Sequence, residues 1–167
     1  NLREYTINDD AKDIDWKSSA RSGNLLVKQF IAEKKHNILL VLDAGIKMDA
    51  DTDKHESKKE LALFTAGTLG YLAIKNNDYV GMIYKGERVE YKPFKYNLYE
   101  LEQYLCDYAA NKSTTSIEME EILEYVAKNI SKRKVIFVIT DLAGINSIKI
   151  QTLKKLKQTS DISIITS

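Results

Sequence analysis

The chain has 167 residues, of which 44% are hydrophobic and 29% charged, and its formal net charge is +1. A chain of this length suits one domain of average size and buries roughly 70% of its unfolded surface, so it can build a core without disulfides. The composition excludes a disordered tail, a collagen-like repeat and a cysteine-stapled mini-protein. A near-zero net charge, with only four arginines among 25 basic residues, also argues against a nucleic-acid binder.

The first part of the sequence predicts two strands and a helix. Residues 1–23 are polar without periodicity, and residues 25–31 alternate weakly, which predicts an edge strand. Residues 38–42 form a continuous apolar run, typical of a central strand buried on both faces, and Asp43 follows it. Residues 57–75 predict a buried helix, whose apolar stretch of about 14 residues is shorter than the roughly 20 that cross a membrane.

A hairpin follows that helix. Residues 79–84 predict a strand, and the turn at 85–87 leads into a shorter strand at 88–91. Pro93 is expected to close the second strand, because proline donates no backbone hydrogen bond.

Two capping signatures predict the next helices. Asn97 with Glu100 begins one, and Thr115 with Glu118 begins another. The single cysteine, Cys106, lies in the first of these amphipathic helices, which predicts a buried and inert thiol. The second helix has a regular apolar stripe: Met119, Ile122, Leu123, Val126, Ala127 and Ile130.

The last elements complete an alternating pattern. Residues 135–140 predict an apolar strand that ends in Asp141, followed by a lysine-rich helix at 147–158 and a strand at 162–166. Strands separated by helices predict an α/β fold. Two of these strands are too apolar to have a solvent-exposed face, which is typical of a parallel sheet covered on both sides. We expect a doubly wound, mostly parallel sheet with helices on both faces and an antiparallel edge.

Two aspartates mark the candidate site. Asp43 and Asp141 each end a buried strand, and ligands of open parallel sheets bind at the carboxyl ends of the strands. Two carboxylates close together would repel each other unless a cation lies between them. The alternative is that each aspartate caps the turn after its own strand.

The sequence gives little support for a calcium site, a zinc site, a phosphate-binding loop or a catalytic nucleophile. Residues 49–53 with Glu60 match a calcium loop in part, but Lys54 stands where that loop needs glycine. His36 and His55 form no zinc pattern, and the sequence contains neither a phosphate loop nor a nucleophile elbow. A conventional enzyme is therefore not expected.

The first 30 residues carry the most specific pattern. It runs from Arg3-Glu4-Tyr5 through residues 9–17 to Ser18-Ser19-Ala20-Arg21 and then Val27-Lys28-Gln29-Phe30. This pattern resembles domain of unknown function 58, the von Willebrand factor A-like family encoded beside MoxR-type AAA+ ATPases. Asn8 and Lys12 depart from the family's usual glycine and arginine. The matching residues are Arg3, Tyr5, Asp9, Asp10, Asp13, Asp15, Trp16 and Arg21.

We interpret the most specific of these residues as a structural clasp, with a direct binding role as the alternative. Asp13, Asp15, Trp16 and Arg21 would hold the segment 1–30 on the remaining domain, with Trp16 as a buried anchor.

The resemblance implies a metal-dependent adhesion site at the carboxyl edge, in degenerate form. Asp43 and Asp141 match the family's two aspartates, and Thr115 (or Thr114) falls at its threonine, although Thr115 also reads as an ordinary helix cap. Gly45 and Lys47 replace the two serines that would bind metal. We therefore expect no bound metal, and we propose that Lys47 acts as a tethered cation, unless its side chain points into solvent.

The expected function is a non-catalytic protein-interaction domain, without a cofactor, that docks its partner at the carboxyl edge. The resemblance implies a MoxR-type AAA+ ATPase, or one of its client proteins, as partner. One alternative is a magnesium-dependent ligand-binding domain that uses Asp43, Thr115 and Asp141. Another is a hydrolase that uses Asp13, Asp15, Asp43 or Asp141.

The domain is expected to belong to a longer protein. The sequence begins without methionine and stops directly after a strand-like run, so both ends look cut. We divide it into the signature segment 1–30, packed on the domain, and the von Willebrand factor A-like domain 31–167. The resemblance implies a membrane-anchored parent with this domain facing the cytoplasm, and no membrane or nucleic-acid contact by this segment itself.

Overall fold

The computed structural model describes residues 2–28, 35–44, 58–112 and 119–166. The chain divides into two compact units, Asn1–Lys34 and Lys35–Ser167, and each is described by itself. The predicted division after residue 30 falls outside the described residues.

The N-terminal unit contains short elements that the sequence pattern did not predict. Strands β1 (Leu2–Glu4) and β2 (Leu26–Lys28) pair antiparallel, and between them lie the 3-10 helix η1 (Ala11–Asp13) and helix α1 (Trp16–Ser22). The strand expected at 25–31 is thus β2, and it belongs to a separate two-stranded sheet. Gly23, with φ of 78°, ends α1 in the left-handed conformation that glycine adopts without strain.

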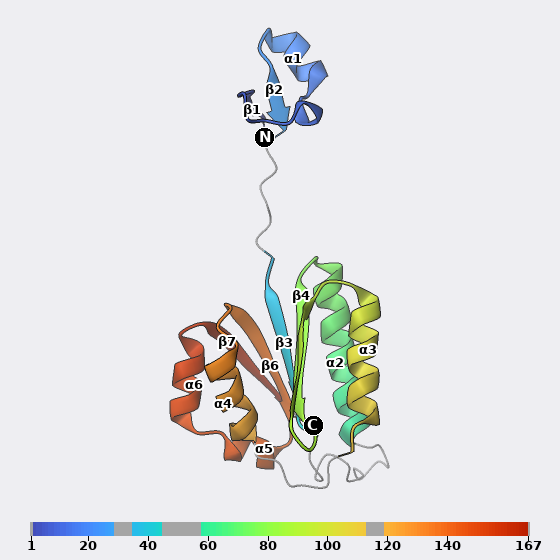
Figure 1. Ribbon diagram of the computed structural model, residues 1–167, viewed down its shortest axis with the longest axis vertical. Helices are drawn as coiled ribbons and strands as arrows, with labels where there is room; N and C mark the ends of the chain where they lie inside the picture. The colour runs from blue at the N-terminus through green and yellow to red at the C-terminus, as the bar shows by residue number, and fades with distance from the viewer. Residues whose placement is uncertain (1, 29–34, 45–57, 113–118, 167) are drawn as a thin grey trace. The chain divides into compact units, whose positions relative to one another are not determined.

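The C-terminal unit is built on a five-stranded sheet in the order β5-β4-β3-β6-β7 (Figure 1). The pairs β3–β4, β3–β6 and β6–β7 are parallel, whereas β4 and β5 form an antiparallel edge hairpin. This arrangement confirms the predicted fold class. The strands are β3 (Asn37–Leu42), β4 (Tyr79–Lys85), β5 (Val89–Lys95), β6 (Lys134–Thr140) and β7 (Ser160–Thr166).

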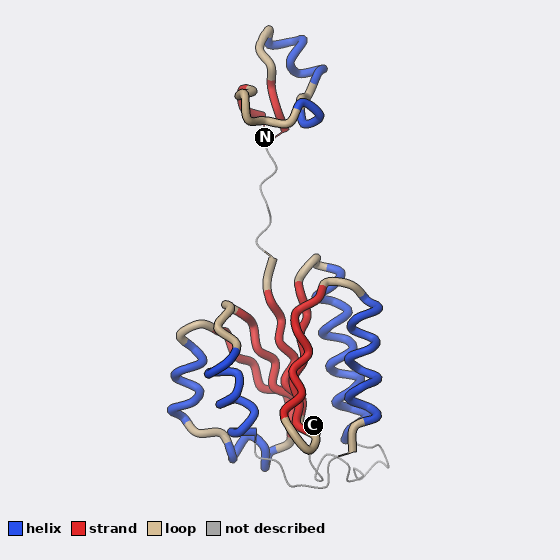
Figure 2. Tube along the Cα trace, in the orientation of Figure 1, coloured by secondary structure: helices blue, strands red, loops and turns tan. Residues whose placement is uncertain are grey.

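Helices cover both faces of this sheet (Figures 1 and 2). Strand β3 has apolar side chains on both faces of the sheet, and each face needs a cover. Leu40 and Leu42 belong to one apolar cluster, and Leu39 and Val41 belong to the other. Helices α2 (Lys58–Lys75) and α3 (Leu98–Ala110) cover the first face, and α4 (Met119–Asn129) and α6 (Ile150–Lys157) cover the second. The short helix α5 (Leu142–Ser147) follows β6 at the carboxyl end of the strands.

Helix α2 is buried on one side only. Ala62, Ala66, Gly70 and Ala73 are buried, whereas 75% of Phe64 is exposed. Leu63, Leu69 and Ile74 are partly buried against the same core. The expectation of a buried helix is therefore correct for this side of α2 and wrong for exposed residues such as Phe64. Within the described residues, no helix is long and apolar enough to cross a membrane.

Three local predictions need correction. Pro93 lies inside β5, where proline is tolerated because this is an edge strand with an irregular register. Cys106 is exposed on α3 and not buried. The helix expected at 147–158 is two helices, α5 and α6, because Ile148 and Lys149 adopt extended backbone conformations. The predicted cap of α3 is confirmed, since the Asn97 side chain accepts a hydrogen bond from the Glu100 N–H at 2.8 Å.

Candidate functional site

Asp43 and Asp141 lie together at the carboxyl edge of the sheet. Asp43 follows β3 and Asp141 follows β6, the parallel neighbour of β3. The ladder continues past β3, because the Asp43 N–H donates to the Ile139 carbonyl at 3.1 Å. Both aspartates are buried, with 4% and 6% of their surface exposed.

Asp43 is held on two sides by buried hydroxyls. Thr140 Oγ1 donates to Asp43 Oδ2 at 2.8 Å, and the Tyr108 hydroxyl donates to the Asp43 carbonyl at 2.7 Å. Tyr108 in turn packs edge-to-face against Tyr84, with ring centroids 5.3 Å apart. These contacts connect Asp43 to β6 and to α3.

Asp141 caps helix α5. Its Oδ1 accepts the Gly144 N–H at 2.8 Å, which satisfies one of the unpaired donors of the helix start. Its Oδ2 lies 3.6 Å from the Lys58 ammonium. The capping interpretation of Asp141 is therefore confirmed, and the same carboxylate also faces a cation.

Gly144 allows this arrangement. A Cβ at Gly144 would overlap Thr140 Oγ1, the hydroxyl that binds Asp43, and would lie 3.1 Å from Met119. Glycine is therefore required where α5 passes Thr140.

Sequence reasoning missed two lysines at this edge. Lys58 faces Asp141, while Lys59 donates to the Asn111 carbonyl and lies over the Tyr108 ring, 5.3 Å from its centroid. A helix dipole disfavours cations in the first turn, so two adjacent lysines at the start of α2 were a signal for nearby carboxylates.

Three predicted site residues, Gly45, Lys47 and Thr115, lie outside the described residues. The tethered-cation hypothesis for Lys47 stays a prediction. In the part of the chain that the structure describes, no cluster of three histidine, cysteine or acidic side chains could hold a metal ion.

A cavity of about 150 Å³ adjoins this edge. Lys58 and Thr140, which take part in the carboxylate contacts, also line the cavity. Its other lining residues are Leu61, Ala62, Thr65, Ile139, Ile165 and Thr166.

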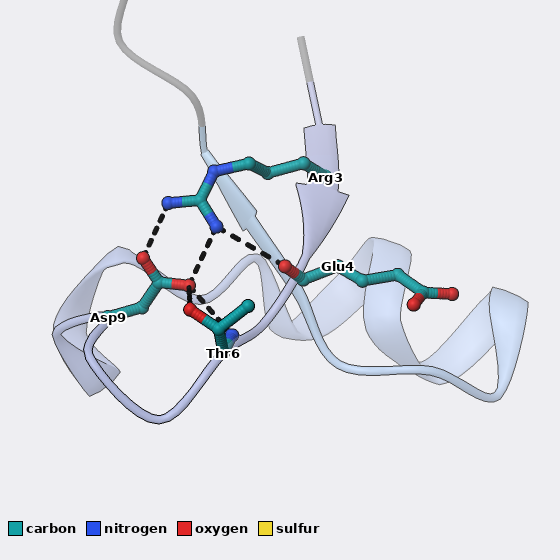
Figure 3. Close-up of polar contacts among 4 residues, drawn as sticks. All are labelled: Arg3, Glu4, Thr6 and Asp9. Atoms are coloured by element: carbon teal, nitrogen blue, oxygen red, sulfur yellow. Dashed lines mark hydrogen bonds and ion pairs between the residues drawn. The ribbon is translucent and has the colours of Figure 1, made fainter.

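Arg3 and Asp9, two signature residues, form a bidentate ion pair in the N-terminal unit (Figure 3). Arg3 donates to the two Asp9 oxygens at 2.7 and 2.5 Å, and Asp9 also accepts the Thr6 N–H at 2.8 Å. The hydrogen bond from Arg3 is the largest of the effects that hold the pKa of Asp9 well below its ordinary value.

Other signature residues shape turns and helix starts. Asp10 accepts the Lys12 N–H in η1, and Asp15 accepts the Ser18 N–H at the start of α1. The latter hydrogen bond lowers the pKa of Asp15. Arg21 is exposed on α1, while Tyr5 and Asp13 are partly exposed.

Trp16 does not belong to the core of its unit, because 64% of its surface is exposed. The buried residues among those described there are Ile14, Ser19 and Val27, which are small in total volume. Trp16 is therefore not buried within its own unit, and its expected role as an anchor on the remaining domain stays a prediction.

The family comparison matches nearly the whole chain. The family described as "Protein of unknown function DUF58" matches residues 1–165. The chain belongs to this family. A search of curated proteins gives no match.

Solved structures share the fold at low sequence identity. BatB from Bacteroides thetaiotaomicron is 16% identical with a TM-score of 0.56, over 78% of this chain and 66% of that one. An aerotolerance-related membrane protein from Bacteroides fragilis is 16% identical with a TM-score of 0.55, over 78% and 67%. A von Willebrand factor type A protein from Catenulispora acidiphila is 10% identical with a TM-score of 0.54, over 78% and 33%. The DUF58 chain thus has a von Willebrand factor A-like fold and spans about two thirds of the length of BatB.

Proposed function

We propose that this DUF58 domain is a non-catalytic protein-interaction domain that docks its partner at the carboxyl edge of the sheet. The observation that supports this most is that the side chains of Asp43 and Asp141 are engaged by donors of the domain itself. Both aspartates are also buried, so little of either carboxylate is within hydrogen-bond reach of a substrate, as an acid or base would need to be. The von Willebrand factor A-like fold supports the same function class.

An exposed apolar residue adjoins this edge. Leu142, the first residue of α5, is 67% exposed and directly follows Asp141. Protein interfaces commonly place apolar side chains at their centre, inside a polar rim. Leu142 is therefore the residue with which we test the surface.

The proposed partner is a MoxR-type AAA+ ATPase or one of its client proteins, and the proposed parent is membrane-anchored with this domain facing the cytoplasm. The resemblance of residues 3–30 to the family signature supports the ATPase. The Bacteroides fragilis neighbour, described as a membrane protein, supports the anchored parent.

We also propose that the edge works without a metal. A divalent cation bound to Asp141 Oδ2 would meet the Lys58 ammonium, which lies 3.6 Å from that oxygen. Like charges this close repel each other, and Lys58 already supplies a positive charge. Magnesium-dependent ligand binding through Asp43, Thr115 and Asp141 is the alternative, and a magnesium titration distinguishes the two.

The test of the interaction is a binding measurement between the full-length parent and a purified MoxR-type ATPase by calorimetry. Leu142→Glu should weaken binding at least about tenfold, because it places a charge in an apolar contact. Tyr96→Glu is the matched control. Tyr96 is 63% exposed but contacts Tyr79, the first residue of β4, at the opposite edge of the sheet. Equal losses in both variants, or no binding by the wild type, would refute the proposal.

A further inference from the structure

The cavity beside Lys58 has the features of a small binding site. It opens between the start of α2 and the carboxyl ends of β6 and β7, and its volume is about 150 Å³. A cavity needs roughly 10–15 Å³ of such volume to hold one water molecule, so this cavity has room for a small group such as one side chain.

Lys58 is the cationic group in the wall of this cavity. Its side chain is 27% exposed, and its ammonium lies 3.6 Å from Asp141 Oδ2. A separation of 3.6 Å is an ion pair but not a hydrogen bond. Apart from this ion pair, Lys58 has no polar partner among the described residues, so that part of the chain leaves its N–H donors open to an acceptor in the cavity.

Of the three other hydroxyls in the wall, those of Thr65 and Thr140 already donate hydrogen bonds, and Thr166 supplies the third. The Thr65 hydroxyl donates to the Leu61 carbonyl at 2.8 Å, and the Thr140 hydroxyl donates to Asp43. The remaining wall is largely apolar, with side chains from Leu61, Ala62, Ile139 and Ile165. An occupant must therefore combine a short apolar stem with a group that accepts hydrogen bonds from an ammonium.

Among the described residues at this edge, the charges do not oppose an anionic occupant. Asp43 and Asp141 are matched in number by Lys58 and Lys59, and the Asp141 carboxylate is further stabilised by the Gly144 N–H. An additional carboxylate would approach Lys58 from the cavity side.

We propose that this cavity binds the side chain of an aspartate or glutamate of the protein partner, with its carboxylate on the Lys58 ammonium. The inference rests on the proposed function, because it assigns the chemistry by which a partner is recognised at this edge. The apolar wall would contact the methylene stem, and the charge-assisted hydrogen bond would select carboxylate over carboxamide.

The test uses two blocked amino acids as probes, N-acetylglutamate methylamide and N-acetylglutamine methylamide. Each is titrated into the intact chain, and the methyl signals of Ile139 and Ile165 are followed by NMR. The glutamate probe should bind saturably in the millimolar range, and the glutamine probe at least about tenfold more weakly. Equal shifts by both probes, or no saturable shift, would overturn the inference.

Variants of Lys58 test whether its ammonium is the group that binds the carboxylate of the probe. Lys58→Met should abolish binding of the glutamate probe, whereas Lys58→Arg, which keeps the charge and folds with the same helix propensity, should retain it. Lys155→Met is the matched control, because Lys155 lines a different cavity with Glu124 and Gln151. Retained binding by a folded Lys58→Met variant, or loss in Lys58→Arg, would contradict the assignment.

Partner binding separates this inference from the function on which it rests. If the ATPase binds the wild type and Lys58→Met equally, the carboxylate pocket is refuted while the interaction function stands. If the wild type binds no partner but discriminates between the probes, the function is refuted while the pocket stands.

Discussion

The Arg3–Asp9 pair shows how one signature contact orders an exposed turn. Asp9 accepts hydrogen bonds from the Arg3 guanidinium and from the Thr6 N–H, and all of these bonds favour the ionised form of its carboxyl group. Because the pKa of Asp9 is lowered in the folded state, its contribution to stability is present above the unfolded pKa, near pH 4. The contribution is lost as the pH falls through the folded pKa.

We expect Arg3→Gln to raise the pKa of Asp9 toward its ordinary value. The order of the turn would then be lost at a higher pH than in the wild type. An NMR titration of the Asp9 carboxyl carbon measures both effects. Arg21→Gln is the control, since Arg21 is exposed on α1 and forms no ion pair within the described residues. A pKa of Asp9 that is equal in wild type and Arg3→Gln would contradict the prediction.

The proposal that Lys58 takes the place of a metal at the candidate site is tested by a substitution at the residue scale. Lys58→Met removes the cation beside a buried carboxylate, and we expect it to cost about 1–3 kcal/mol, between the values for exposed and buried ion pairs. Millimolar magnesium should not change the melting temperature of the wild type but should raise that of the variant, because a ligand of the native state stabilises it.

The same titration tests Lys47. In the Lys58→Met background, replacing Gly45 and Lys47 together by serine should increase the magnesium-dependent stabilisation further, because two hydroxyl ligands return and neither lysine competes with the metal. A wild-type melting temperature that rises with magnesium would contradict the hypothesis that Lys47 replaces the metal and also the hypothesis that Lys58 does.

At the scale of the element, α2 and α3 pack closely through glycine. A Cβ at Gly70 would lie 2.7 Å from Leu101 Cδ1, whereas a Cβ at Gly67 would lie 3.5 Å from Leu105 Cδ1. Leu101 is 3% exposed, so it has little room to move.

We therefore expect opposite effects from two identical substitutions. Gly67→Ala should stabilise the chain by about 0.5–1 kcal/mol, since alanine loses less backbone entropy in a helix. Gly70→Ala should be less stable than Gly67→Ala by about 1–3 kcal/mol, because it overpacks a filled contact. Urea unfolding measures the stability of both variants. Equal stabilities of Gly67→Ala and Gly70→Ala would contradict the prediction, because they would show that the Leu101 side chain can move aside with no loss of stability.

Elements with strong local signals were predictable from the sequence. The apolar runs at 38–42 and 135–140 correspond to β3 and β6, and Asn97 caps α3. The division between α5 and α6 was not predictable, because a distant side chain determines it. Buried Glu120 of α4 accepts the Lys149 N–H at 3.0 Å and the Thr152 hydroxyl at 2.6 Å, and these contacts hold the chain where α6 begins.

The candidate site was predictable only in part for the same reason. Asp43 and Asp141 follow neighbouring parallel strands, so the rule for sheet edges places them together. Lys58 reaches Asp141 from a helix more than 80 positions earlier in the sequence, and no spacing rule connects the two. The elements of residues 1–23 were missed because short polar caps, from Asp10 and Asp15, replace periodicity there.

At the scale of the whole molecule, the two units differ in the number of side chains that they bury. Among its described residues, 2–28, the unit Asn1–Lys34 buries only Ile14, Ser19 and Val27. Domains below roughly 40 residues usually need disulfides, metals or oligomerisation. We expect a peptide of residues 1–34 to be unfolded by circular dichroism, and a chain of residues 35–167 to unfold cooperatively. Trp16, the single tryptophan, reports on the peptide by fluorescence. A cooperative melt of the peptide alone would contradict this prediction.

The two edges of the sheet are protected unequally. The β5 edge carries Pro93, Lys92 and Lys95 and an irregular register, all features that hinder pairing with another strand. The β7 edge has seven residues with no proline and one charge, Asp161, and Ile164 is 39% exposed on it. Among the described strands, β7 pairs with β6 alone.

A strand edge that no described strand covers favours self-association of the chain through strand pairing. We expect Ile164→Lys to lower self-association of the chain at high concentration, because a charge at the free edge opposes pairing, while the melting temperature changes little. Sedimentation velocity over a concentration series measures the effect. Tyr96→Lys is the control, since Tyr96 is exposed but follows the end of β5 and lies on no free strand edge. If the two variants reduce association equally, added charge alone explains the result and the β7 edge plays no part in it.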